Sequence, residues 1–167
     1  MKPRIRLSSP QRSDQRDFLA AAGASLALHR PWVTAPSTPQ AFRAYVAAMQ
    51  RPENRGFVVR SRADDGLVGV ISVTNIVRGI FRSAYLGYYA FAGYERQGLM
   101  TEALRAVVRE AFGPMKLHRL EANIQPGNVA SIALVKACGF SLEGYSPRYL
   151  KIGGRWRDHE RWAIVAR

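Results

Sequence analysis

The chain has 167 residues, of which 47% are hydrophobic and 22% are charged. This length suits one domain with one sizeable core, so we expect a single domain over residues 1–167. No apolar run is long enough to span a bilayer, and the start lacks the apolar run of a signal peptide, so we expect a cytoplasmic protein with no membrane partner. Cys138 is the only cysteine, which excludes an internal disulfide and a metal site built on several thiolates.

The charge of the chain is strongly basic. There are 25 Lys and Arg against 12 Asp and Glu, a net charge of +13. Such a field attracts polyanions: a nucleotide, RNA or an RNA-rich particle. A merely solvated basic surface explains the excess equally well. Because no aromatic-interleaved RNA-binding motif accompanies the charge, we expect no sequence-specific nucleic acid partner.

The first third of the chain predicts one strand and two helices. A strand at 4–7 is followed by a helix at 14–28. Several prolines then make 29–38 a loop. Thr38 is expected to cap a second helix that ends near 51–52, because a proline follows it at the first helical position.

The middle of the chain predicts three strands and a long helix. Strands at 57–60 and 67–76 flank an Asp-Asp-Gly turn and should pair antiparallel, and 85–91 is a further, aromatic-rich strand. Apolar residues then recur at helical spacing from close to Gly98 as far as Gly113. We therefore expect the third helix between these two glycines.

The last third predicts a strand, a short helix and a hairpin. The strand is expected at 117–125, the helix at 128–138, and two final strands on either side of Gly153 and Gly154. Strands with helices inserted between them, and no repeats, indicate an α+β fold with a mixed sheet.

A glycine-bearing loop before the third helix is suited to binding an anion. The loop 95–101 leads past Gly98 into a helix start whose first N–H groups have no partners within the helix. These groups and the positive end of the helix suit a pyrophosphate, and Gly98 permits close approach because it has no Cβ.

A second segment places two polar residues at the start of the fourth helix. Asn128 can cap this helix, which is a purely structural role. Ser131 falls in the first turn, where its hydroxyl can bond its own helix or face a cleft. Neither residue indicates an enzyme by itself.

Together and in this order, these segments resemble the GNAT acetyltransferases. The loop 95–101 is similar to their acetyl-CoA loop, Q/R-x-x-G-x-G/A, and 128–140 is similar to their N-x-x-S/A…G-F helix and turn. Three further segments resemble the RimJ members of the RimJ/RimL-like ribosomal-protein-alanine N-acetyltransferases: 72–81, 85–88 and 144–159. The resemblance runs from about Val68 to the end of the chain, and residues 1–55 match only loosely.

The resemblance implies the GNAT (acyl-CoA N-acyltransferase) fold, a central, mixed, mostly antiparallel sheet flanked by helices. It implies acetyl-CoA as co-substrate, no metal, and direct attack of a primary amine on the thioester. The implied acceptor and partner is the N-terminal α-amine of a protein, including one on the ribosome, and the chain is expected to be a monomer or a homodimer. The cofactor-binding residues implied by the resemblance are Phe91, Ala92, Arg96, Gln97, Gly98, Leu99, Met100, Thr101 and Asn128.

The catalytic residues are only partly implied. In RimL-like relatives a serine at the place of Ser131 is the proposed general acid, so the resemblance gives Ser131 that role. The glutamate that serves as base there aligns with Leu150, and the tyrosine acid of many GNAT enzymes aligns with Val135. No general base is identified in this way. Glu121 is a second catalytic candidate, acting through a water, or else a residue of strand pairing.

Aromatic residues are candidates for the acceptor pocket. Trp32, Tyr85 and Tyr88 can bind the substrate, or pack in the core instead. Asp158 and His159 are candidates for proton handling, although we expect them to brace the last hairpin instead.

The loop departs from the family pattern at two positions. Glu95 stands where Gln or Arg is usual, and Met100 takes the usual Gly/Ala place. A glutamate there repels a pyrophosphate unless its side chain turns outward and Arg96 supplies the cation.

Protonation favours an α-amine as the acceptor. At pH 7 an α-amine of pKa ~8 is about 10% neutral, whereas a lysine of pKa ~10.4 is about 0.04% neutral. An enzyme without an obvious base can therefore still use an α-amine. Two alternatives stay open: an acetyltransferase for a small amine (antibiotic, polyamine or aminoacyl nucleotide), and a catalytically impaired ribosome- or RNA-binding module on the same fold.

Overall fold

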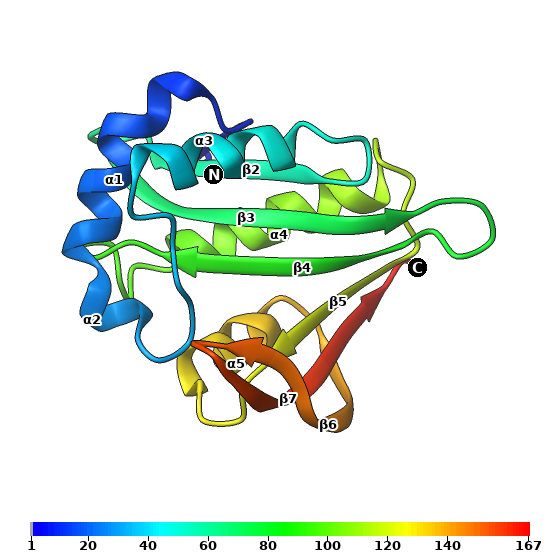
Figure 1. The fold of residues 1–167 in the computed structure, drawn as a ribbon. Helices are drawn as coiled ribbons and strands as arrows, with labels where there is room; N and C mark the ends of the chain where they lie inside the picture. The colour runs from blue at the N-terminus through cyan, green and yellow to red at the C-terminus, as the bar shows by residue number, and fades with distance from the viewer. Residues whose placement is uncertain (1) are drawn as a thin grey trace.

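A computed structural model describes residues 2–167 and shows one sheet with helices on both faces (Figure 1). The strands are β1 (Ile5–Ser8), β2 (Arg55–Ser61), β3 (Leu67–Val77), β4 (Ser83–Ala90), β5 (Arg119–Ile124), β6 (Ser141–Ile152) and β7 (Arg155–Val165). The helices are a 3-10 turn η1 (Arg12–Asp14), α1 (Gln15–Ala24), α2 (Leu26–His29), α3 (Pro39–Met49), α4 (Leu99–Phe112) and α5 (Val129–Ala137). None of the helices within residues 2–167 combines the length and the apolar character needed to cross a membrane.

The sheet has seven strands in the order β1-β2-β3-β4-β5-β7-β6. Within residues 2–167 every neighbouring pair of these strands is antiparallel except β4 and β5, which are parallel. The predicted α+β fold, with a mixed and mostly antiparallel sheet, is therefore confirmed.

Each face of the sheet is covered by a different set of helices. On one face the apolar stripe of α4, including Leu104 and Val107, packs with alternate residues of the strands in the main core. On the other face Phe18 of α1 and Phe42 of α3 form a second cluster with Val70 of β3. Figure 1 shows α3 and α4 on opposite sides of the strands. Alternation along the strands thus supplies apolar side chains to both helical layers.

The predicted helix at 14–28 is broken into α1 and α2 at Ser25. The buried Ser25 hydroxyl donates to the Ala21 carbonyl at 2.6 Å and accepts the Ala92 N–H at 2.9 Å. A hydroxyl that bonds back to its own helix and also to a distant loop competes with the regular helical hydrogen bonds. The bend brings α2 against the far end of β4.

The parallel pairing of β4 and β5 is short. It joins Ser83–Tyr85 of β4 to Arg119–Glu121 of β5 and goes no further. Beyond it β4 continues to Ala90 and β5 to Ile124, while Figure 1 shows β5, β7 and β6 turning away from the other strands. Both strands therefore present backbone groups without a strand partner along the gap, and such groups need other partners.

Candidate active site

A cleft of about 960 Å³ opens where β4 and β5 diverge. Its walls come from both strands, from the first turns of α4 and α5, from the α2 segment and from the β6–β7 hairpin. This volume is typical of pockets that hold a large organic ligand.

One end of the cleft is a site for an anion at the start of α4. The first N–H group bonded within the helix is that of Glu102, which donates to the Gly98 carbonyl at 3.1 Å. The N–H groups of Leu99–Thr101 have no acceptor among residues 2–167. Arg96 and Gly98 both have a left-handed backbone, with φ of 60° and 73°, and this arrangement turns successive N–H groups towards one concavity. The predicted helix start at Gly98 is confirmed, and free N–H groups beside a positive helix end fit a pyrophosphate.

Glu95 lines the cleft next to this concavity. Its carboxylate accepts the Gly93 N–H at 2.7 Å, so the side chain is folded back onto its own loop. Arg96 also lines the cleft. The departure of Glu95 from the family pattern is thus compatible with an anion at the start of α4.

Tyr88 of β4 and Ser131 of α5 meet across the middle of the cleft. Their hydroxyl oxygens are 2.7 Å apart, and the Tyr88 hydroxyl also lies 3.1 Å from the Ser131 carbonyl, to which it can donate. Burial raises the pKa of Tyr88, although the hydrogen bond with Ser131 opposes the shift, so the phenol is protonated at neutral pH. The pair is a protonated hydroxyl relay facing the cleft.

Asn128 holds this serine in place. Its side-chain oxygen accepts the Ser131 N–H at 3.2 Å, so the predicted helix cap is confirmed. Since Asn128 also lines the cleft, the cap and a contact with a ligand are compatible.

Phe91 and Ala92 lie just past the end of β4 and have no free N–H group. Phe91 donates to the Val68 carbonyl at 2.8 Å, and Ala92 donates to the Ser25 hydroxyl at 2.9 Å. The Phe91 side chain is buried in the second cluster. Neither residue lines the cleft, so the cofactor contacts expected of them have no support in the geometry.

Glu121 and Tyr85 also lie outside the cleft lining. The Glu121 carboxylate binds Arg119 at 3.0 Å, and the same guanidinium binds Glu143. Tyr85 is 40% exposed on the paired part of β4. For Glu121 the geometry supports the strand-pairing alternative, because its carboxylate is held in an ion-pair network.

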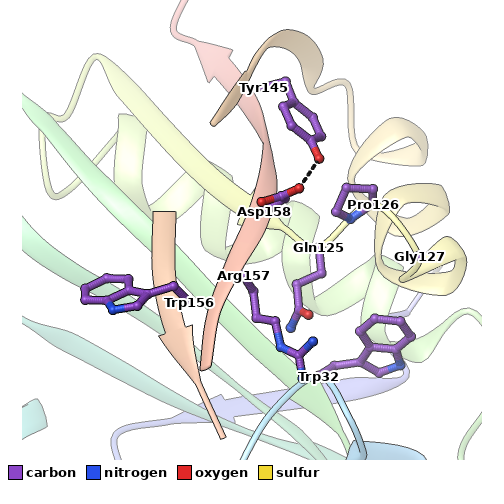
Figure 2. Close-up of a pocket in the computed structure, with 8 residues that line it drawn as sticks. All are labelled: Trp32, Gln125, Pro126, Gly127, Tyr145, Trp156, Arg157 and Asp158. Carbon is purple, nitrogen blue, oxygen red and sulfur yellow. Dashed lines mark hydrogen bonds between the residues drawn. The ribbon is translucent and has the colours of Figure 1, made fainter. Parts of the chain in front are cut away.

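Trp32 forms a wall between the cleft and a smaller recess of about 320 Å³. Figure 2 shows this recess, in which the side chains of Gln125 and Arg157 point towards Trp32. On its other side the Tyr145 hydroxyl donates to Asp158, which also accepts the Arg148 N–H at 2.8 Å. Asp158 thus braces the hairpin as predicted, and the recess adjoins the cleft at Trp32 and Gln125.

Several further polar residues line the cleft that were not among the predicted site residues, including His29, Asn123 and His159. Buried His29 lies with its Nε2 2.8 Å from the Ala90 carbonyl, although its segment was expected to be a loop. The Asn123 side-chain oxygen is buried without a partner among residues 2–167. His159 is 3% exposed and was expected to brace the hairpin, with proton handling as the alternative. The alternation of β5 and β7 puts Asn123 and His159 on one face, but the sequence does not show that this face borders a cleft.

Comparison with known proteins identifies a family with this architecture. The profile of the family described as "Acetyltransferase (GNAT) domain" matches residues 4–141. The Bacillus subtilis protein named "Probable N-acetyltransferase YjcK" is 33% identical over 153 residues, which are 92% of this chain and 83% of that protein.

Two further relatives carry more specific names. The Escherichia coli "[Ribosomal protein uS5]-alanine N-acetyltransferase" is 43% identical over 99 residues, 59% of this chain and 51% of that enzyme, so the match spans about half of its length. The solved structure described as "Mycobacterium smegmatis RimJ in complex with CoA-disulfide" has a TM-score of 0.89 and 26% identity, covering 97% of this chain and 82% of that chain. The predicted resemblance to RimJ/RimL-like enzymes is confirmed.

Proposed function

Because the chain belongs to the GNAT acetyltransferase family and is an N-acetyltransferase, we propose that it transfers the acetyl group of acetyl-CoA to the N-terminal α-amine of a protein. The observation that carries the proposal is the position of the Tyr88–Ser131 pair. It lies in the gap between β4 and β5, in the same cleft as the free N–H groups of α4.

The chain's own groups suit each part of the co-substrate. The N–H groups of Leu99–Thr101, with Arg96 beside them, would bind the pyrophosphate. The backbone edges of β4 and β5 that lack a strand partner would bind the amide groups of the pantetheine arm, as a further strand does in a sheet. When bound, acetyl-CoA supplies the acetyl group as an activated thioester.

Ser131 and Tyr88 would deliver a proton to the leaving sulfur. If Tyr88 donates to the serine oxygen, the proton of Ser131 is free to face the cleft, and Tyr88 stabilises the oxygen as that proton leaves. Val135 is buried and apolar, so it offers no proton. This assignment gives Ser131 the role of general acid and Tyr88 the role of its proton-donating partner.

The acceptor assignment rests on chemistry and on the names of relatives. An α-amine is neutral about two orders of magnitude more often than a lysine at pH 7, which lowers the demand on a base. The relatives include an enzyme named for the alanine of ribosomal protein uS5. The net charge of +13 would draw the enzyme towards an RNA-rich particle that carries such a substrate.

A panel of amines tests the proposal. Release of the CoA thiol would be followed with peptides that begin with Ala or Ser, with the same peptides blocked at the N-terminus, and with polyamines and amino acids. We expect rapid turnover only for the free N-terminal peptides. Turnover confined to a small amine would contradict the acceptor assignment, and no turnover with any amine would favour an impaired binding module.

A further inference from the structure

One face of β5 and β7 carries polar side chains next to the cleft. Trp162 of β7 packs in the main core with α4, so the alternate residues Arg157, His159 and Arg161 face the opposite side of the sheet. Asn123 of β5 is the register partner of Arg161 and belongs to this face.

Three polar atoms on this face are buried without a partner among residues 2–167: the Asn123 side-chain oxygen and the Nε atoms of Arg157 and Arg161. An unpaired buried polar group costs about 1–3 kcal/mol, so native proteins rarely keep several together. Asn123 lines the cleft and Arg157 lines the adjoining recess of Figure 2. The unpaired atoms of Asn123 and Arg157 are therefore suited to a polar ligand that enters between β7 and Trp32.

One ring nitrogen of His159 is hydrogen-bonded to the backbone, and the other is free to accept a hydrogen bond from a ligand. Its Nδ1 lies 2.9 Å from the Arg157 carbonyl, and because a carbonyl only accepts hydrogen bonds, Nδ1 must carry a hydrogen. In the neutral ring Nε2 then has a lone pair. Nε2 has no hydrogen-bond partner among the described residues, and the ring lines the cleft.

His159 and Asn123 are spaced to hold one amine between them. His159 is two residues from Arg161 along β7, so it is the diagonal neighbour of Asn123, at about 7–8 Å between Cα atoms. Two hydrogen bonds of about 2.9 Å each to a shared nitrogen fit between side chains at this spacing. The pairing of Ile124 with Glu160 also puts His159 at the end of β5, from which the chain runs directly to Asn128 and Ser131.

We infer that His159 is the general base that deprotonates the acceptor amine, and that the Asn123 oxygen holds the amine beside it. This inference rests on the proposed acetyl transfer and supplies the base that the sequence did not show. Among the residues lining the cleft, Glu95 is the one carboxylate, and its charge is bound to the Gly93 N–H. Leu150, which takes the place of the relatives' glutamate, lines the cleft as an apolar wall.

The proton balance is complete with these groups. The ammonium gives one proton to Nε2 of His159, which returns it to water. The neutral nitrogen forms the C–N bond, the C–S bond breaks, and its electron pair goes to the sulfur. As the amide forms, the nitrogen gives its second proton to Nε2 of His159, which again passes it to water. The sulfur gains a proton from the Ser131 hydroxyl, which is restored through the relay and solvent. One proton is released in net.

Two matched histidine variants test the inference. His159→Asn keeps a donor at the δ position for the Arg157 carbonyl but removes the base nitrogen. His118→Asn makes the same substitution at an exposed histidine that does not line the cleft. With a peptide that begins with Ser, we expect H159N to lose about 10²-fold or more in kcat/KM, and H118N to stay within a few-fold of the unmodified enzyme.

Two further measurements separate catalysis from folding. Acetyl-CoA should bind H159N with a Kd within about twofold of the unmodified enzyme, and the loss in rate should shrink with a weakly basic amine of pKa about 6 that is already neutral. In long-range ¹H–¹⁵N spectra, the neutral His159 ring should carry its proton on Nδ1, and the Nε2 signal should shift when peptide joins the CoA complex. His159→Gln repeats the kinetic test if the Asn variant does not fold.

Activity of H159N within about threefold of the unmodified enzyme, or a spectrum with the proton on Nε2, would overturn the inference. Either result leaves the proposed function intact. The proposed function itself fails if the unmodified enzyme acetylates no peptide at its N-terminal α-amine, and the NMR measurement still decides the state of His159 in that case.

Discussion

The hydroxyl of Tyr88 lies 2.7 Å from the hydroxyl of Ser131, although 43 residues separate them in the chain. Tyr88 belongs to β4 and Ser131 to α5, so the hydrogen bond crosses the gap that the diverging strands leave. In the proposed reaction the general acid Ser131 therefore acts together with its hydrogen-bond partner Tyr88.

Ser131→Ala and Tyr88→Phe should lower kcat together but not additively. We expect S131A to lose about 10²-fold or more in kcat, because a general acid contributes at least that much, and Y88F to lose less. In the S131A background, Tyr88→Phe should cost little more, since it acts through the serine. The measurements are kcat for the four proteins and the Kd of acetyl-CoA, which should change by less than about twofold. Fully additive effects would show that the two hydroxyls act separately.

Two glycines with nearly the same positive φ separate folding from cofactor binding. Gly98 at the start of α4 and Gly79 at the β3–β4 turn have φ of 73° and 72°. Alanine at either position should lower the free energy of unfolding by about 1–2 kcal/mol, because the left-handed region disfavours a Cβ. Only Gly98→Ala should also weaken acetyl-CoA binding, by about tenfold or more, because it disturbs the free N–H groups. Equal affinities in calorimetry would place the pyrophosphate elsewhere.

The order of elements and most of their ends could be predicted from local patterns. Gly98 and the glycine at 113 bound α4 where the sequence placed them, and Asn128 caps α5 as expected. Helix caps and the glycines that end helices depend on residues close by in the chain, so they can be recognised in a single sequence.

The contacts within the site could not be predicted in the same way. The Tyr88–Ser131 contact and the orientation of His159 depend on where β4 and β5 stop pairing, which is a property of the whole sheet. The role of Ser131 was therefore predicted from a resemblance. Tyr88 was predicted to bind the substrate or pack in the core, and His159 was expected to brace the hairpin. The break at Ser25 was missed for the same reason, since its partner Ala92 is distant in the chain.

A buried and an exposed ion pair should differ clearly in their effect on stability. Asp14 binds Arg60 at 2.9 Å with side chains only 12% and 10% exposed, whereas Asp65 binds Arg6 with 69% and 47% exposed. Asp14→Asn should lower the free energy of unfolding by about 3 kcal/mol, because it leaves a buried guanidinium charge less well paired. Asp65→Asn should cost less than about 1 kcal/mol. Urea unfolding of both variants checks this, and equal losses would contradict it.

The hairpin beside the recess should respond to acid through Asp158. The Tyr145 hydroxyl, and after it the Arg148 N–H, hold the pKa of Asp158 below its usual value. A lowered pKa in the folded state means that the stabilisation is present above the unfolded value of about 3.9 and is lost as pH falls through the lowered value. Tyr145→Phe should raise the pKa of Asp158 in an NMR titration of the carboxyl carbons.

Asp64 serves as an internal control in that titration. Its pKa is lowered by the Ser61 side chain, the Gly66 N–H and the Tyr94 hydroxyl, none of which Tyr145→Phe removes. Its value should stay unchanged in the variant. A parallel rise in both carboxyl groups would show a general loosening of the fold in place of a lost hydrogen bond.

The most direct test of the proposed function is the position of the acetyl group in a product. One peptide would carry a free N-terminal Ser or Ala and an internal lysine, and would be incubated with acetyl-CoA and the enzyme at pH 7. Fragmentation mass spectrometry locates the added acetyl group. We expect it on the α-amine, because that amine is neutral about two orders of magnitude more often than the lysine. Acetylation of the lysine alone would contradict the account.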